Sequence, residues 1–291
     1  MVQTLLTSIA VILRIVSNPL ANVFQKKLTL DGRDPLTVNF ITYFLLSVGC
    51  IFIVLSIHPA NLSKAFWMYS IAGGIAGGVG NGFLVKALKE GQLSILGPIN
   101  SYKSLVGIIV GIFLLGEIPN IWGVIGIAMI IYGSYFVLGT TDEGFSWAIL
   151  KRAEIQFRIW AMILTAIEAV FIKKVMLASS PAMAFISWCV FGTLFAFVFL
   201  LINQRGTRKS IIPASGEITR YIYVVILIGI MQLTTIYSFK HMPVGYALAL
   251  FQLSAIVGVL LGHRIFNEKD IRKKLLGAAI MVTGSVIIII T

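Results

Sequence analysis

Apolar stretches follow one another along this chain, each bounded by charged, polar or proline residues. A helix needs about 20 mainly apolar residues to cross a bilayer, so each stretch predicts a transmembrane helix. The connections are too short for a folded extramembrane domain, which places the function of the protein among the helices. Ten spans are predicted, at residues 4–24, 36–57, 66–86, 93–115, 120–138, 157–177, 182–202, 219–239, 244–265 and 271–290.

The two halves of the chain repeat one another. Residues 87–136 align without a gap with residues 238–287, at a constant offset of 151. A weaker match joins Phe24–Lys27 to Phe171–Lys174. Two unrelated apolar segments would not align several glycines and a glutamate at one offset, so the match indicates an internal repeat. The repeated pairs are Lys89 and Lys240, Gly107 and Gly258, Gly111 and Gly262, Glu117 and Glu268, Gly126 and Gly277, and Gly133 and Gly284.

This repeat predicts the topology. Residues 1–138 form a first five-helix unit, residues 139–156 a connecting loop, and residues 157–291 a second unit. Because five is odd, the second unit enters the membrane from the opposite side, an arrangement that secondary transporters use. The expected fold is an all-α integral membrane protein with ten transmembrane helices in two inverted five-helix repeats.

Composition narrows the class of protein. Of all residues 58% are apolar and only 12% charged, about half the charged fraction of soluble domains. A soluble enzyme, a disordered regulator and a secreted toxin are therefore excluded. The net charge of +12 indicates basic loops facing anionic lipid, and no nucleic acid is needed to explain it. Cys50 and Cys189 stand alone in apolar runs, so no disulfide framework, metal site or cofactor is expected.

The repeated motifs resemble those of the drug/metabolite transporter superfamily, specifically its ten-helix EamA-type members. In the first copy they are Leu114-Leu115-Gly116-Glu117, Gly126 and Gly133, and in the second Phe266-Asn267-Glu268, Gly277 and Gly284. The second copy has Asn267 in place of Gly116, and the first helix has Ser17-Asn18-Pro19 where many relatives have Trp-Gly. The resemblance implies a non-enzymatic, multi-pass transporter of a small organic molecule, in a cell membrane and most typically the bacterial inner membrane.

Three charged residues fall near the middle of predicted spans, namely Arg14, Lys103 and Glu168. A charge at this depth costs roughly 2.5–3.5 kcal/mol, so each needs a partner or a purpose. A structural salt bridge of Glu168 with Lys103 or Arg14 would leave one cation over. A water-filled cavity, or an anionic group on a ligand, explains the surplus better.

Polar residues also fall on helix faces. Arg14, Asn18 and Asn22 are spaced i, i+4, i+8, and Asn100 shares a face with Lys103. Pro19 and Pro98 would free backbone carbonyls inside their helices. Hydrogen bonds between helices are the alternative for any single amide. The predicted substrate-binding residues are Arg14, Asn18, Asn22, Asn39, Tyr43, Asn81, Asn100, Lys103, Glu168, Gln232, Tyr237 and Gln252.

The remaining motifs have structural interpretations. Small residues four apart, such as Gly74, Gly78 and Gly82, predict close helix packing, and no Lys-Ser/Thr pair follows them as in a nucleotide loop. Glu117 and Glu268 each precede a helix, so we expect them to cap it, with a gating role second. The chain shows neither the metal-ligand spacing of HExxH nor a GxSxG elbow, which argues against an enzyme.

These observations predict a secondary transporter that moves a small anionic or zwitterionic metabolite by alternating access, with proton coupling through Glu168 as an option. A lipid-translocating or channel-like protein and a membrane scaffold are the alternatives. The oligomeric state stays open and is compatible with a monomer. With ten spans, the side that holds both termini has four basic loop residues and the opposite side has seventeen. Basic loop residues are in excess on the cytoplasmic side, so the count favours both termini outside. The family is usually drawn with both termini inside.

Overall fold

The computed structural model describes residues 2–54, 62–103, 106, 120–141, 147–203 and 213–290. These residues form helices and no strand. Short 3₁₀ turns occur at Asn100–Tyr102, Trp147–Lys151 and Ser215–Glu217. The helices are α1 (Val2–Leu30), α2 (Pro35–Val54), α3 (Lys64–Glu90), α4 (Leu93–Ile99), α6 (Ile121–Leu138), α7 (Ala153–Ala178), α8 (Pro181–Asn203), α9 (Ile218–His241), α10 (Val244–Phe251), α11 (Ser254–Phe266) and α12 (Ile271–Ile290).

Local sequence signals explain several helix starts. Pro35 and Pro181 occupy first helical positions, where a missing N–H costs nothing. The Ser63 hydroxyl accepts a hydrogen bond from Phe66 N at 3.2 Å. The Asn120 side chain accepts one from Gly123 N at 2.9 Å. Each cap satisfies an N–H group that has no partner within its own helix.

Seven helices in the described part of the chain are long and apolar enough to cross a membrane. α7 and α12 are outside this set, and part of the predicted span at 93–115 lies outside the described residues. The structure therefore supports a multi-pass membrane protein, while ten crossings remain a prediction. The seven are Gln3–Leu30, Pro35–Val54, Lys64–Glu90, Ile121–Leu138, Pro181–Asn203, Ser215–His241 and Val244–Phe266.

The span predicted at 244–265 is present as Val244–Phe266, but its helix is broken locally, which the sequence did not predict. α10 ends at Phe251, and α11 starts at Ser254. Around this point the backbone bonds run from residue i+3 to residue i, as from Leu253 N to Leu250 O at 3.1 Å. At the offset of 151, the first copy changes from α4 to a 3₁₀ turn at the same place, Asn100–Tyr102. Both copies thus break their fourth helix at equivalent residues.

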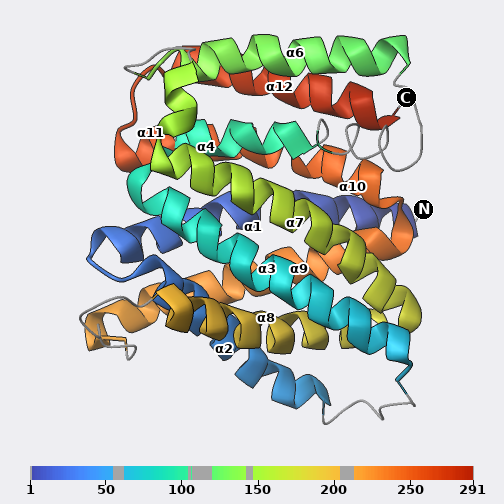
Figure 1. Cartoon of the computed structure of the whole chain (residues 1–291). Coiled ribbons are helices and arrows are strands. Elements are labelled where there is room, and N and C mark those ends of the chain that lie inside the picture. The colour runs from blue at the N-terminus through green and yellow to red at the C-terminus, as the bar shows by residue number, and fades with distance from the viewer. Residues whose placement is uncertain are drawn as a thin grey trace.

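Contacts between the two halves follow the repeat. α1 packs on α9 and α7 packs on α3, which are equivalent pairs when α7 repeats α1 and α9 repeats α3. α2 packs on α8, and α6 packs on α12 along one edge of the bundle (Figure 1). α1 begins and α12 ends at the same end of the molecule (Figure 1).

The α6–α12 pair shows the relative direction of the two copies. A Cβ on Gly126 would meet Gly284 O, and a Cβ on Gly133 would meet Gly277 O. A later residue of α6 therefore contacts an earlier residue of α12, so the two equivalent helices are antiparallel. This is the geometry that an inverted repeat predicts.

The glycines of α3 pack against two neighbours. Gly74, Gly78 and Gly82 lie against α8, where a Cβ on Gly78 would meet Ala196 N. Gly77 lies against α7, where a Cβ would meet the Glu168 carboxylate. The packing role predicted for these residues is thus seen, and it brings α7 close enough to place Glu168 in the middle of the bundle.

Candidate binding cavity

A polar cavity of about 90 Å³ lies where α1, α3, α7 and α9 meet the end of α4. It admits several water-sized molecules, because one water needs roughly 10–15 Å³ on this measure. Eight predicted site residues line it: Arg14, Asn18, Asn22, Asn81, Asn100, Lys103, Glu168 and Gln232.

The other four predicted residues lie elsewhere. Asn39 donates a hydrogen bond from Nδ2 to Gly78 O at 2.9 Å and so joins α2 to α3. The Tyr43 hydroxyl does not line the cavity, but it accepts a hydrogen bond from Asn81 Nδ2 of the cavity wall at 2.7 Å. Gln252 Oε1 accepts from Asn100 Nδ2 at 3.1 Å, across the two helix breaks. Tyr237 lines a separate apolar groove.

Arg158 is a cavity residue that the sequence did not reveal, because it falls among the seventeen basic residues expected in loops. In the structure α7 begins at Ala153, and Arg158 is buried and lines the cavity. The signal was available, because Arg158, Thr165 and Glu168 are spaced i, i+7, i+10 and all line the cavity from α7. Trp188, Thr235 and Phe251, also in the wall, carry no comparable signal.

Arg158 is held by a break in a neighbouring helix. Asn100 N bonds to Gly97 O and Pro98 O, so it does not bond to Leu96 O as a regular α-helix would require. Arg158 Nε takes up the free Leu96 O at 2.7 Å. The 3₁₀ turn after α4 therefore provides the acceptor that fixes a cation at the cavity wall.

Glu168 is buried, but the salt bridge considered for it is not formed among the described residues. Its carboxylate accepts from Trp188 Nε1 at 2.6 Å, and neither Arg14 nor Lys103 lies within ion-pair distance of it. Trp188 in turn packs its ring on Tyr43, with 4.8 Å between centroids. The carboxylate is thus oriented by a neutral donor, which leaves the cations free of it.

Arg14 is only partly satisfied. Its Nε donates to Thr235 Oγ1 at 2.8 Å, and its guanidinium lies over the Phe251 ring at 4.9 Å from the centroid. Arg14 Nη1, Asn22 Oδ1 and Gln232 Nε2 are buried without a partner among the described residues. Buried polar groups are almost always hydrogen-bonded, so these atoms mark where water or a ligand binds.

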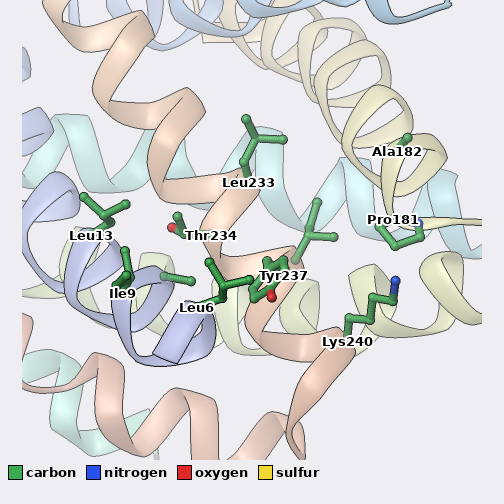
Figure 2. Close-up of a pocket in the computed structure, with 11 residues that line it drawn as sticks. Leu6, Ile9, Leu13, Pro181, Ala182, Leu233, Thr234, Tyr237 and Lys240 are labelled. Carbon is green, nitrogen blue, oxygen red and sulfur yellow. The ribbon is translucent and has the colours of Figure 1, made fainter. Parts of the chain in front are cut away.

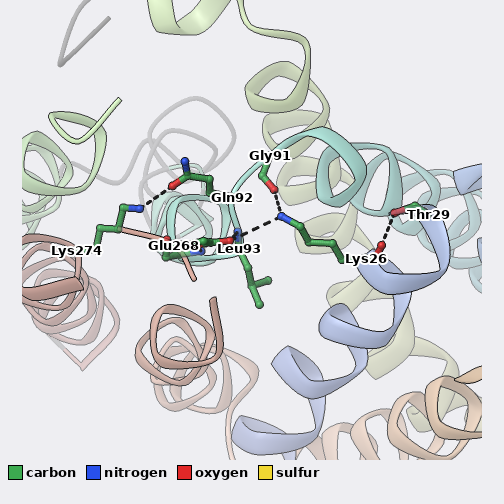
Figure 3. Close-up of polar contacts among 8 residues, drawn as sticks. Lys26, Thr29, Gly91, Gln92, Leu93, Glu268 and Lys274 are labelled. Atoms are coloured by element: carbon green, nitrogen blue, oxygen red, sulfur yellow. Dashed lines mark hydrogen bonds and ion pairs between the residues drawn. The ribbon is translucent and has the colours of Figure 1, made fainter. Parts of the chain in front are cut away.

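Glu268 makes a second buried polar cluster, beside the start of α4 (Figure 3). Its carboxylate accepts from Leu93 N at 2.8 Å and Ser94 N at 2.9 Å, and also from the Ser94 hydroxyl. Capping was predicted, but of the helix that follows Glu268. The helix capped is α4, 174 residues away along the chain, because the inverted fold brings the α11–α12 connection onto it.

Lys26 completes this cluster. Its Nζ lies 3.7 Å from Glu268 Oε1 and donates to Gly91 O at 2.5 Å. Lys274 Nζ donates to Gln92 Oε1 at 2.6 Å beside it. In the second copy Lys173, the repeat partner of Lys26, donates to Phe239 O near the end of α9. The repeated lysines therefore bind backbone carbonyls at the ends of the equivalent helices α3 and α9. Glu117, the repeat partner of Glu268, lies outside the described residues.

Among the residues that the structure describes, no group of three or more His, Cys, Asp or Glu side chains is arranged to hold a metal ion. Cys50 and Cys189 are buried free thiols. The polar side chains that line the cavity carry amides, hydroxyls, an indole, one acid and three cations.

Comparisons with known proteins agree with this architecture. A model of the EamA-like transporter family matches residues 6–139 and again residues 153–290, close to the two repeats. A crystal structure described only as that of a protein is similar over 96% of this chain and 96% of its own, with a TM-score of 0.66 at 15% identity, which shows the fold alone. No curated protein matches. The chain therefore belongs to the EamA-like transporter family, within the drug/metabolite transporter superfamily, and is a multi-pass membrane protein.

Proposed function

We propose that this protein is a secondary transporter that moves a small anionic or zwitterionic organic metabolite by alternating access to the cavity between α1, α7 and α9. Membership of the EamA-like transporter family supports transport in general, without indicating the substrate. The antiparallel relation of the two copies supports alternating access, because such repeats can exchange conformations. The small cavity volume supports a ligand of few atoms.

One observation carries the choice of ligand charge. Arg14, Lys103 and Arg158 line the cavity with a single acid, Glu168, among the described residues. Three cations close together at membrane depth are costly without anions. A carboxylate or phosphate would offset this cost and would meet the unpartnered Arg14 Nη1 and Gln232 Nε2.

Glu168 has a separate role in this proposal. Its hydrogen bond from Trp188 orients the carboxylate at the cavity. A buried acid near cations can take up a proton, or can pair with the amine of a zwitterionic ligand. Either event would couple ligand binding to the charge of the cavity, which is what transport driven by a proton gradient requires.

The alternatives are less well supported by the geometry. A lipid translocase needs a polar path for the headgroup that opens to the bilayer, whereas the polar cavity lies between helices and the open groove beside α1 is apolar. A channel would show flux that does not saturate with substrate. A scaffold would tolerate the loss of the cavity charges.

Replacing Lys103 by methionine tests the proposed function. Lys103 forms no ion pair among the described residues, so its loss should leave the unfolding temperature unchanged or raised, because an unpaired charge in the cavity wall is removed. Ligand binding should weaken about tenfold or more, since hydrogen bonds to charged groups contribute about 1.5–3 kcal/mol. The measurements are the thermal shift with carboxylates, amino acids and phosphorylated compounds, and uptake into proteoliposomes.

The matched control is Lys89→Met, which removes an exposed lysine at the end of α3. It should leave both binding and uptake unchanged. Unchanged uptake in Lys103→Met and Arg14→Ala would contradict the proposal. Uptake that never saturates in the wild type would favour a channel instead.

Replacing Glu168 by glutamine tests the coupling. The glutamine side chain still accepts a hydrogen bond from Trp188, but it cannot bind a proton at neutral pH. Exchange of labelled for unlabelled substrate should persist, while accumulation driven by a pH gradient should be lost. Gradient-driven accumulation at the wild-type level would show that Glu168 does not carry the proton.

A further inference from the structure

An open apolar groove of about 540 Å³ runs between α1, α9 and the start of α8 (Figure 2). Leu6, Ile9 and Leu13 of α1 form one wall, and Leu233 of α9 forms the other. These four side chains are 45–48% exposed. The volume is within the usual range for ligand sites. The groove is distinct from the polar cavity, because Arg14 and Glu168 do not line it.

The groove is long and aliphatic. Leu6, Ile9 and Leu13 are spaced i, i+3, i+7 and therefore share one face of α1. Seven residues of α-helix rise about 10 Å, which gives the wall the length of a large part of an acyl chain. Its lining is almost wholly hydrocarbon, so a flexible apolar chain would lie in it without leaving polar groups unpaired.

One end of the groove is cationic. Lys240 lies beside Pro181 at that end, with Tyr237 one turn earlier on α9 (Figure 2). Lys240 is exposed and has no acid within ion-pair distance among the described residues. It stands in the last turn of α9, one residue before the end of the candidate span Ser215–His241. A lysine and a tyrosine at this position lie at the depth of lipid headgroups.

We propose that this groove is a binding site for an anionic phospholipid, with one acyl chain along α1 and the phosphate at Lys240. An apolar groove with an exposed lysine at one end, which pairs with no acid among the described residues, fits this ligand. A neutral sterol, or an acyl chain alone, would leave the lysine without a partner. The binding itself does not depend on the proposed transport.

The groove and the polar cavity lie on opposite sides of the α1–α9 contact, and neighbouring residues of each helix line one or the other. Leu13 faces the groove while its neighbour Arg14 faces the cavity, and Thr234 and Thr235 of α9 divide in the same way. The Arg14–Thr235 hydrogen bond of 2.8 Å lies between the two. A bound chain therefore supports the α1–α9 contact that positions Arg14. If the proposed function holds, anionic lipid should also raise the transport rate.

The test is native mass spectrometry of the purified protein with phosphatidylglycerol and, separately, phosphatidylcholine. Wild type should retain phosphatidylglycerol in preference. Lys240→Gln should weaken its binding about fivefold, as expected for the loss of one basic residue near a lipid surface. Ala182→Phe should fill the groove and reduce binding of both lipids.

Two controls make the result specific. Lys64→Gln removes an exposed lysine in the first turn of α3, away from the groove, and Ala279→Phe adds an aromatic ring to an exposed site on α12. Both should bind lipid as wild type does. Equal retention of the two lipids, or phosphatidylglycerol binding unchanged in Lys240→Gln, would overturn the proposal. Lys103→Met should lose transport and still bind lipid as wild type does, because Lys103 lines the cavity and not the groove. The two proposals can therefore fail independently.

Discussion

Asn267 adopts a left-handed backbone conformation, with φ 53°, where α11 ends. This conformation costs most residues about 1–2 kcal/mol, and only Gly, Asn and Asp adopt it readily. The repeat partner of Asn267 is Gly116, so the sequence difference between the copies exchanges two residues suited to the same conformation.

Substitutions at position 267 should reflect that conformation. Asn267→Gly should change stability by a few tenths of a kcal/mol at most, whereas Asn267→Val should lower it by about 1–2 kcal/mol. Thermal unfolding in detergent measures both. Equal unfolding temperatures for the valine variant and the wild type would show that the backbone here relaxes without cost.

The site residues show what sequence reasoning can reach at this scale. Arg14, Lys103 and Glu168 could be predicted because they are charged residues near the middle of predicted spans, and all three line the cavity. It did not find that Trp188 orients Glu168, because the pairing depends on how α7 and α8 meet. Tyr237 lines the apolar groove and not the polar cavity, and a helix with polar residues on several faces gives no single direction from which to predict this.

Among the elements, α3 depends most on the absence of side chains. A Cβ on Gly77 would overlap the Glu168 carboxylate and approach the Tyr43 hydroxyl. Gly77→Ala should therefore displace Glu168, lower stability by about 1–3 kcal/mol and reduce transport.

Gly49→Ala is the matched control, because a Cβ at this position of α2 would have no neighbouring atom within 4 Å. It should be as stable and as active as the wild type. Unfolding temperature and uptake, measured for both variants, separate a local clash from a general effect of added methyl groups. Wild-type transport in Gly77→Ala would show that the α3–α7 contact is not tight.

Helix position was largely predictable, and helix continuity was not. The end of α4 has a local signal in Pro98, which lacks an N–H and disturbs the regular bonding. The equivalent break at Gln252–Leu253 contains neither proline nor glycine. The Asn100–Gln252 hydrogen bond joins the two breaks, so the second break lies at a contact between the halves, which a local window of sequence does not contain.

Across the whole molecule, the internal repeat was the most informative part of the sequence. An offset of 151 and an odd number of helices predicted opposed copies, and the Gly126–Gly284 and Gly133–Gly277 contacts show α6 and α12 antiparallel. What the repeat could not predict is which residues meet between copies. Glu268 shows this, because it caps α4 of the first half and pairs with Lys26 of α1.

The Glu268 cluster joins the two halves at the end of the molecule that holds Gly91 and the α11–α12 connection. Under the alternating access that we propose, this contact must break when this end opens. Glu268→Ala removes the cap, at a cost of about 0.5–2 kcal/mol. It leaves Lys26 with Gly91 O and with the Phe266 ring, whose centroid lies 4.9 Å from Nζ. We expect the variant to expose the cavity more often to this side. A cysteine introduced at Asn100, with Cys50 and Cys189 replaced by serine, should react several-fold faster with a membrane-impermeant thiol reagent.

Glu217→Ala is the control for that experiment. It breaks another ion pair, in which Arg33 Nη2 and Glu217 Oε2 are 2.5 Å apart, at the same end of the molecule but away from α4. Because this pair joins the α1–α2 connection to the start of α9 and touches no cavity residue, its loss should leave the labelling rate unchanged. Equal rates in Glu268→Ala and the parent protein would mean that the contact is a static helix cap. Faster labelling in Glu268→Ala alone would identify it as the closure on this side.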